Sequence, residues 1–246
     1  MPIKLTTIMI TRFIVNLIYC CWSYLAFIIV IIPGYLLVTL SPKLSYRQAF
    51  CKMTAQALLL LMGQKITNAS DNLIPRNALI LINHTSYIDA VIMRASLPKD
   101  TSFLIKDEVN RVPLVGLFLR RIDSIFVKRK SRSSRADSLL AIRAKLKTGG
   151  RVALFPEGTF SKNPGIKKFH LGSISLAHEE KVPIVSMAIS GARKMLTSGS
   201  WFLKYSRLSL TFDQLIRPEE FKEPLVMAEN IRNNFSKITG EELLNG

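Results

Sequence analysis

The segment at residues 78–89 reads ALILINHTSYID, an apolar run that changes within one residue into a polar stretch. A short apolar run bounded by polar residues is typical of a buried strand, and the Asn, Thr and Ser that follow suit the start of a helix. We therefore expect a strand at 78–82, a loop that carries His84, and a helix at 87–97. Loops at strand ends commonly present reactive side chains, so this junction is the first candidate for a functional site.

The same alternation of short apolar runs and helical patterns continues to the end of the chain. It predicts further strands at 102–105, 124–127, 152–155, 184–189 and 208–212, and further helices at 114–121, 135–147, 171–181 and 218–238. Strands that alternate with helices favour a mostly parallel central sheet flanked by helices. The predicted fold class is α/β, and the loops at the carboxyl ends of its strands should converge on one edge of the sheet.

An apolar N-terminal segment precedes this pattern. No charged residue occurs from Phe13 to Pro42, and the stretch 13–32 has the length that a helix needs to cross a bilayer, about 20 residues. The run is too long for a secretory signal peptide, and no small-residue cleavage site follows it. We expect residues 1–45 to form a membrane anchor and residues 46–246 to form the α/β domain, with the apolar run at 55–62 closing a linker helix against that domain.

Two topologies fit the anchor. Either 13–32 is a single spanning helix, or Pro33-Gly34 turns the chain back into a helical hairpin within one leaflet. Lys and Arg lie on both sides of the segment: Lys4, Arg12, Lys43, Arg47 and Lys52. Because cytoplasmic flanks attract positive charge, this arrangement favours the hairpin and places the α/β domain on the cytoplasmic side.

The overall composition indicates contact with an anionic lipid surface. Lys and Arg total 34 against 17 Asp and Glu, a net charge of +17, yet 48% of the residues are hydrophobic and the mean hydropathy is +0.24. This excludes a disordered basic tail. The basic stretch 128–147 lacks aromatic residues, so we expect no nucleic-acid partner. The three cysteines (Cys20, Cys21 and Cys51) have neither disulfide nor zinc spacing, so we expect no metal.

His84 and Asp89 have the chemistry of a general base and the carboxylate that orients it. The imidazole can accept a proton from a nucleophile, while the carboxylate sets its tautomer and stabilises the imidazolium. Five residues along a regular helix would turn the two side chains about 500° apart. The pairing therefore requires His84 in the loop and Asp89 in the first helical turn. The alternative is that His84 only caps the helix.

Three further strand ends carry polar residues. Residues 155–161 read FPEGTFS, a predicted tight turn that presents Glu157 and free backbone N–H groups to a hydroxyl or a phosphate. Arg129 follows the strand at 124–127, and Lys106 follows the strand at 102–105. Each feature alone fits an ordinary turn or a solvated charge. Together they follow separate strands and would meet at one edge of the sheet.

At these residues the chain resembles the glycerolipid acyltransferase family, which includes bacterial 1-acylglycerol-3-phosphate acyltransferases. The family has four blocks in a constant order. The His-x4-Asp block is matched in full at 83–89. The other three are matched with changes: Asp123 stands for Gly at 123–129, Phe160 for Arg at 155–161, and Ser186 for the second Pro at 182–187. The resemblance covers residues 77–212.

The resemblance implies an O-acyltransferase that moves a fatty acyl chain from acyl-CoA or acyl-carrier protein to the free hydroxyl of a lysophospholipid. The first acceptor it implies is 1-acylglycerol-3-phosphate, which gives phosphatidic acid. His84, oriented by Asp89, would deprotonate the hydroxyl, which attacks the thioester directly. Backbone N–H groups of the fourth block or of the His84 loop would stabilise the oxyanion.

The resemblance also assigns the acceptor site and the surroundings. Glu157, Gly158 and Thr159 would hold the acceptor, and Arg129 its phosphate. No cofactor is implied beyond acyl-CoA or acyl-carrier protein as co-substrate. The implied partners are membrane phospholipid and lysophospholipid, and the implied location is the cytoplasmic face of a bacterial inner membrane.

The change at Phe160 leaves the acceptor open. It removes the positive charge that the family usually offers to a phosphate, and Lys106 or Lys162 would have to replace it. An acyltransferase for another lysophospholipid or a lyso-aminolipid is therefore one alternative. A non-catalytic membrane lipid-binding protein on the same fold is another.

Overall fold

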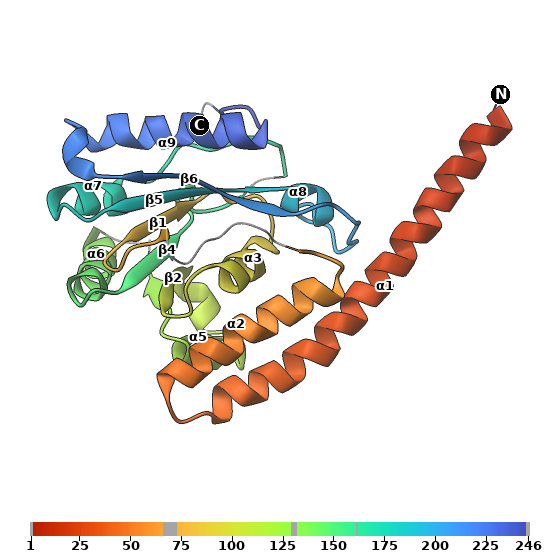
Figure 1. The fold of residues 1–246 in the computed structure, drawn as a ribbon, viewed down its shortest axis with the longest axis horizontal. Coiled ribbons are helices and arrows are strands. Elements are labelled where there is room, and N and C mark those ends of the chain that lie inside the picture. Colours follow the sequence, from red (N-terminus) through yellow and green to blue (C-terminus); the bar gives the residue numbers. More distant parts are fainter. Residues whose placement is uncertain (1, 66–72, 129–131, 161, 245–246) are drawn as a thin grey trace.

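A computed structural model describes residues 2–65, 73–128, 132–160 and 162–244, with the helical backbone alone described at 2–7 and 132–135. A six-stranded sheet with strand order β3-β2-β4-β1-β5-β6 forms its centre (Figure 1). The strands are β1 (Leu79–Ile82), β2 (Thr101–Lys106), β3 (Ile125–Val127), β4 (Arg151–Leu154), β5 (Ile184–Ser190) and β6 (Ser209–Ile216). All neighbours are parallel except β5 and β6. The predicted mostly parallel α/β fold is confirmed, and β6 is longer than its predicted range.

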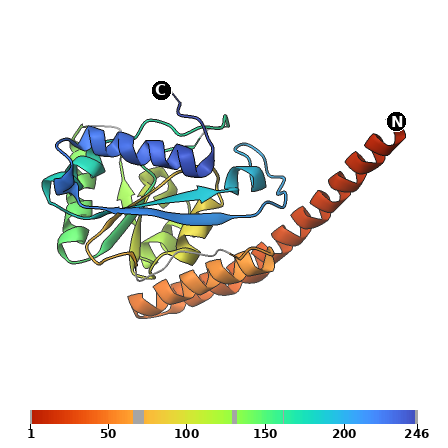
Figure 2. The ribbon, with the colours of Figure 1, turned by 45° about the horizontal axis from the view of Figure 1, so that its top comes forward.

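Helices cover both faces of the sheet, so its central strands are apolar along their whole length; all four residues of β1 are buried. On one face lie α2 (Leu44–Leu61) and α3 (Asp89–Ser96), and on the other lie α6 (Arg132–Lys147), α7 (Gly172–Glu179) and α9 (Pro224–Thr239). Figure 2 shows α9 and α2 on opposite sides of the sheet. At the edge are α4 (Asp107–Asn110), α5 (Val115–Arg121) and α8 (Ala192–Met195).

The predicted single helix at 218–238 is wrong in its first part. Residues Pro218–Glu220 form a 3-10 turn, and Glu223 is extended before α9 begins at Pro224. A residue that precedes proline is pushed out of the helical region by contact with the proline ring, which explains the break. The four-residue helices α4 and α8 were not predicted, because one helical turn is too short to show a periodicity.

The N-terminal segment is a helical hairpin, although its turn is not where the sequence suggested. Helix α1 (Pro2–Leu40) continues through Pro33 and ends at Leu40, after which α2 returns alongside it (Figure 1). The predicted break at Pro33-Gly34 is therefore wrong. A proline removes one main-chain hydrogen bond, but α1 stays helical here, where it packs closely on α2. A Cβ atom at Gly34 would lie 2.3 Å from Oγ1 of Thr54, so only glycine permits this approach.

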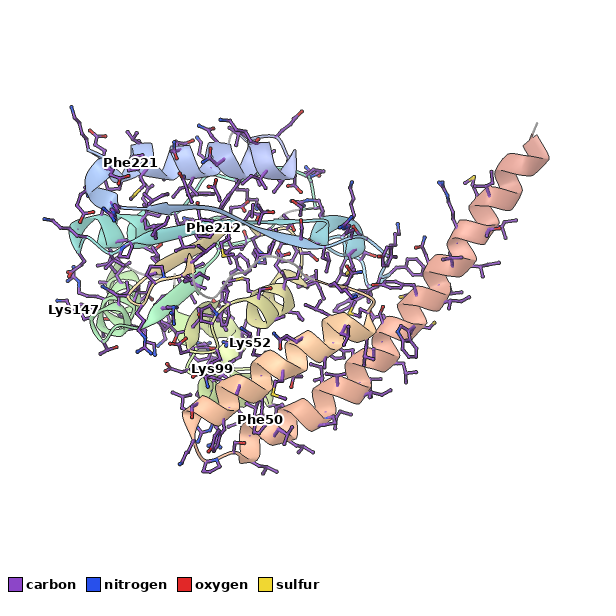
Figure 3. The ribbon with its side chains drawn as sticks, viewed as in Figure 1. Phe50, Lys52, Lys99, Lys147, Phe212 and Phe221 are labelled. Atoms are coloured by element: carbon purple, nitrogen blue, oxygen red, sulfur yellow. The ribbon has the colours of Figure 1, made fainter. Side chains whose placement is uncertain are left out.

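Side-chain contacts hold the hairpin to the α/β domain. Arg121 of α5 donates to the carbonyl oxygens of Thr39 and Ser41, where the C-terminal dipole of α1 favours a cation. Nearer the N-terminus, the Tyr24 hydroxyl donates to the carbonyl of Trp201. Phe13 of α1 still stacks on Phe202, and only the N-terminal end of α1 extends away from the domain (Figure 3). Residues Ile8–Leu40 are long and apolar enough to cross a membrane.

Candidate active site

His84 and Asp89 meet at the carboxyl end of β1. His84 lies in the loop after the strand, Asp89 is the first residue of α3, and Nδ1 of the imidazole is 3.0 Å from Oδ2 of the carboxylate. Asp89 is completely buried and also accepts the backbone N–H groups of Thr85 at 2.6 Å and Ser86 at 2.8 Å. These donors stabilise the carboxylate charge. Since the carboxylate only accepts, Nδ1 carries the proton and Nε2 is left as the basic nitrogen.

Buried polar side chains hold the His84 loop in place. The Asn83 amide donates to the carbonyl of Ile189 at 3.0 Å and accepts the Ile189 N–H at 2.6 Å, which ties the end of β1 to β5. The Ser86 hydroxyl donates to the carbonyl of Leu196 at 2.7 Å. Both side chains are fully buried. Because a buried polar group must find partners, these bonds specify a single loop conformation.

Glu157 lies directly beneath this loop. Its side chain accepts the His84 N–H at Oε1 (2.8 Å) and the Lys167 N–H at Oε2 (2.9 Å), and the residue is only 4% exposed. Gly158 has a φ of +74°, which lets the turn reverse tightly enough to point Glu157 inward. The sequence prediction assigned Glu157 to the acceptor. In the structure its two oxygens support the backbone of the base, and direct contact with the acceptor stays a prediction.

Burial raises the pKa of Glu157 from 4.5 to about 7, even though its two backbone hydrogen bonds act in the opposite direction. The folded protein thus holds this proton more tightly than the unfolded chain. Ionising Glu157 should therefore reduce stability progressively as the pH rises from about 4.5 to about 7, by about 3 kcal/mol in total, with no reduction below that window and the full reduction above it.

Replacing Glu157 by glutamine tests this coupling, because glutamine resembles the protonated acid and does not ionise. Its amide nitrogen faces one of the two backbone N–H groups that the carboxyl oxygens accept, so we expect the Glu157→Gln variant to unfold at a lower temperature near pH 5 and this difference to shrink as the pH rises to 7–8. The measurement is thermal unfolding of both in the same detergent across this range. If the difference between the melting temperatures of the two proteins stays the same at every pH, the raised pKa of Glu157 is contradicted.

Aromatic side chains form the wall of the site. The Phe155 ring stacks on the imidazole of His84, with centroids 3.8 Å apart and planes 5° from parallel. Phe160 meets the imidazole edge-on at 4.5 Å and also contacts Tyr87. Tyr87 in turn stacks on Trp201. The residue that replaces the family arginine is therefore an apolar neighbour of the base.

The other predicted acceptor residues are not gathered as closely. Thr159 is half-buried, and its Oγ1 lies 3.5 Å from Nζ of Lys167. Lys106 ends β2 at the same edge of the sheet, with part of its surface exposed. Arg129 lies outside the described residues. No group of three His, Cys, Asp or Glu side chains within the described ranges is placed to hold a metal ion.

The predicted oxyanion donors need a correction. The N–H groups of His84, Thr85 and Ser86 all point to the carboxylates of Glu157 and Asp89. The N–H of Ile189, near the end of β5, points to Asn83. A donor that is already bonded to a protein carboxylate is poorly placed to stabilise a developing oxyanion. These N–H groups of the His84 loop are therefore excluded as oxyanion donors in this conformation.

Two departures from the family pattern have local explanations. Asp123 replaces a glycine and has a φ of +66°, a region that glycine adopts freely and that aspartate tolerates better than most residues. Its carboxylate is paired with Lys145 and accepts the hydroxyl of Ser102. Ser186 replaces a proline in β5, and its hydroxyl donates to Asp213 of the neighbouring strand at 2.7 Å. Neither change touches His84.

Two cavities adjoin Phe155, the residue that follows β4, and they lie on opposite sides of that strand. The first, of about 240 Å³, lies under the helical hairpin between α1, α2, α3 and α5, and Arg94 is the only charged side chain among the described residues that line it. The second, of about 530 Å³, lies between the strand ends and the helices α6 and α7, and Lys128, His170 and Ser173 line it. Because Phe155 lines both cavities and stacks on His84, each reaches the neighbourhood of the base.

The supporting residues of the site were the part that the sequence analysis missed. Lys167 contacts Glu157 through its backbone N–H, and Asn83 acts across 106 residues of chain, so no local pattern reveals either role. The stacking of Phe155 had a weak signal. Its position at the end of the predicted strand 152–155, where the predicted turn begins, placed an aromatic ring at the same edge of the sheet as His84.

Comparison with known proteins gives a consistent picture. A 1-acyl-sn-glycerol-3-phosphate acyltransferase of Cocos nucifera is 25% identical over 172 residues, which is 70% of this chain and 56% of that protein. A probable enzyme of the same name from Mycoplasma genitalium is 25% identical over 196 residues, covering 74% of this chain and 72% of the relative. A lyso-ornithine lipid O-acyltransferase of Pseudomonas aeruginosa is 31% identical over 120 residues, which is 48% of this chain and 45% of that protein.

A solved structure agrees with the fold. The crystal structure of the 1-acyl-sn-glycerophosphate acyltransferase PlsC from Thermotoga maritima superposes with a TM-score of 0.74 over 92% of this chain and 97% of that one, at 22% identity. The family model described as acyltransferase matches residues 65–190, just over half of the chain, and this range includes β1 to β5 with the paired His84 and Asp89 and the Glu157 turn. The chain therefore belongs to the acyltransferase family.

Proposed function

We propose that the protein transfers a fatty acyl chain from an acyl thioester, acyl-CoA or acyl-carrier protein, to the free hydroxyl of 1-acylglycerol-3-phosphate, which gives phosphatidic acid. The observation that carries this proposal is the 3.0 Å contact between His84 Nδ1 and Asp89, which directs the basic Nε2 away from the carboxylate. The third family block lies against this base through Phe155, Glu157 and Phe160. Relatives that bear this activity in their names support the choice of acceptor.

The reaction needs only these groups and the two substrates. Nε2 of His84 takes the proton of the acceptor hydroxyl as its oxygen attacks the thioester carbonyl carbon. Asp89 stabilises the imidazolium that results. The tetrahedral intermediate then collapses, the C–S bond breaks, and the leaving thiolate takes the proton back from His84. The products are an ester and a free thiol, and the base is restored without an acyl-enzyme.

The two cavities suit the two parts of the substrates. The cavity under the hairpin is apolar apart from Arg94, as an acyl chain requires. The larger cavity has Lys128 and His170 in its wall, which suits a polar or anionic headgroup. Phe155 borders both, so a substrate with its chain in one cavity and its headgroup in the other would present its reacting atoms beside His84.

We also assign the protein to a membrane, with α1 as the anchor and the α/β domain on the cytoplasmic face. The support is the exposed apolar surface of α1 and the lysines and arginines at both ends of the hairpin. Lysolipid acceptors partition into a bilayer while thioester donors are cytosolic and anionic. A basic domain held at that surface meets both substrates.

A lyso-aminolipid is the second candidate acceptor, and Phe160 favours it. This ring stands where the family usually has an arginine, in contact with His84, and the Pseudomonas aeruginosa relative is named for a lyso-ornithine lipid. Phe160→Arg should then raise the ratio of lysophosphatidate to lyso-ornithine lipid turnover about tenfold or more, since a charge-assisted hydrogen bond contributes about 1.5–3 kcal/mol. The measurement is competition between the two acceptors in one assay.

Phe160→Leu is the matched control for that prediction, because it removes the ring without adding a charge. It should change the absolute rate but leave the ratio of the two acceptors within about threefold. A leucine variant that shifts the ratio as far as the arginine variant would show that ring packing, and not the missing charge, selects the acceptor.

An acceptor screen tests the proposed function itself. Purified protein in mixed micelles receives one labelled acyl thioester and, in separate reactions, lysophosphatidate, other lysophospholipids and lyso-ornithine lipid. We expect the label to appear in phosphatidic acid, with release of one thiol per product. Release of no thiol with any acceptor would favour the non-catalytic lipid-binding alternative.

A further inference from the structure

A second apolar surface lies outside the helical hairpin. The side chains of Val112, Leu114, Val115 and Leu117 are all exposed, and Leu114 is 66% exposed. We call these four side chains the apolar wedge. Single exposed hydrophobic residues are common on any protein, but four within six residues form a contiguous patch, and such patches mark an interaction surface.

The wedge is rigidly built. Leu114 has a φ of +63°, a strained conformation for a leucine that persists only when the surroundings impose it. The surroundings here are specific: a Cβ atom at Gly116 would lie 2.0 Å from the carbonyl oxygen of Asn110, so only glycine fits. Arg120 donates to the Asn110 side chain, and the Gly116 N–H donates to the Val112 carbonyl. The strain therefore holds large apolar side chains outward.

The wedge adjoins both the hairpin and the catalytic edge of the sheet. It follows β2 and α4 at the carboxyl end of the strands, and Figure 1 shows α5 beside the hairpin. Within α5, Phe118 stacks on Tyr35 of α1, and Phe118 and Leu119 line the apolar cavity. On α1, Leu36 and Leu40 are exposed near this contact. The wedge thus continues the apolar surface of the anchor toward the site.

The charges around the wedge suit one kind of partner. Arg111, which precedes the wedge, and Arg120, near the end of α5, both have exposed side chains, and Arg111 pairs with Asp107. Arg121 is directed to the carbonyl oxygens at the end of α1. Apolar side chains with exposed arginines beside them match a bilayer with anionic headgroups, where the arginines remain at headgroup level while the apolar groups enter the acyl region.

We propose that the apolar wedge inserts into the anionic leaflet that holds α1 and so keeps the cavity between α1 and α5 at the depth of the acyl chains. This proposal rests on the membrane location proposed above and not on the reaction. It makes the wedge a second point of attachment, which would set the tilt of the α/β domain relative to the bilayer.

The test is depth-dependent fluorescence quenching on the full chain. Because α1 alone would keep the protein on vesicles, sedimentation does not report on the wedge. In a background with Trp22→Phe and Trp201→Phe, the single-tryptophan change Leu114→Trp is mixed with phosphatidylethanolamine–phosphatidylglycerol vesicles whose acyl chains carry bromine. We expect at least twofold quenching relative to unbrominated vesicles, with a blue-shifted emission. Leu117→Trp, on the regular helix α5, repeats the test without the backbone strain.

The matched control is Leu225→Trp. Leu225 is 51% exposed near the start of α9, on the far side of the sheet from the hairpin (Figure 2). Its indole should not be quenched. Equal quenching by brominated vesicles of the tryptophans at positions 114 and 225 would overturn the proposal. Failure of the protein to float with vesicles would also overturn it.

A different partner would give a different result. A blue shift at position 114 without vesicles, together with no bromine quenching, would identify a protein surface or a second copy of the chain as the occupant and overturn the proposal. Acyl transfer is measured separately in detergent with the unmodified protein, which keeps Trp201 stacked on Tyr87 beside the site. Absence of transfer with quenching intact in the variants would count against the proposed function alone.

Discussion

Replacing His84 by alanine should reduce acyl transfer by about 10²- to 10⁴-fold, the range that a positioned general base contributes. Among the described residues, the rings that contact the imidazole, those of Phe155 and Phe160, have no basic atom that could take over. The measurement is the initial rate of thiol release with lysophosphatidate at saturating thioester. Far-UV circular dichroism and vesicle flotation of the variant should match the unmodified protein.

His178→Ala is the control for that change. His178 lies in α7, where Nε2 is 2.8 Å from the carbonyl oxygen of Phe221, on the opposite face of the sheet from the hairpin. Its loss should lower the melting temperature slightly and leave the rate within about twofold. A His84→Ala protein that turns over as fast as the His178→Ala protein would rule out the proposed mechanism.

Asp89→Asn should also reduce the rate by about 10²- to 10⁴-fold, although it keeps the size of the side chain. Nδ1 of His84 and the backbone N–H groups of Thr85 and Ser86 all contact the same oxygen, Oδ2. An asparagine oxygen in that place keeps these contacts and the tautomer of the imidazole, and its amide nitrogen faces the Thr85 hydroxyl. The variant loses the negative charge that stabilises the imidazolium, and this loss slows the reaction.

The control for this variant is Asp213→Asn, which alters a carboxylate that accepts the hydroxyl of Ser186 away from the site. It should keep near-normal turnover. An Asp89→Asn protein with a rate close to that of the Asp213→Asn protein would mean that Asp89 serves only to close the loop. The two variants therefore separate a structural role of a carboxylate from stabilisation of the imidazolium.

The fold and the meeting of the principal residues could be predicted because they depend on local patterns. The apolar runs of β1 and β4 end directly before His84 and Glu157, and parallel strands bring such ends to one edge. The end of α1 could not be predicted in this way. Pro33 is a strong local signal for a break, and it is overridden by the packing of Gly34 on Thr54, a contact between residues 20 positions apart.

The role of Glu157 is a second feature that could be predicted from the sequence only in part. The turn around it was predicted, yet sequence alone does not reveal that both carboxylate oxygens face inward to the N–H groups of His84 and Lys167. That arrangement depends on burial, which also raises its pKa to about 7. The side chain of Glu157 then supports the backbone of the base, and its direct contact with the acceptor stays a prediction.

Aromatic packing around the base was equally hidden. Phe160 was recognised only as the loss of an arginine, whereas the structure gives it contacts with both His84 and Tyr87. Through Tyr87 and Trp201 these rings link the site to the loop that holds α1. The site and the proposed anchor are thus packed as one unit, which suits an enzyme whose acceptor arrives from a bilayer.

The most direct test is a double-variant cycle on the two paired residues. The rates of His84→Ala, Asp89→Asn and the combined variant are compared with that of the unmodified protein. If Asp89 acts through the imidazole, it has nothing left to stabilise once His84 is gone, so the combined variant should be no slower than His84→Ala alone. Independent losses that multiply in the combined variant would contradict the pairing on which the proposed chemistry depends.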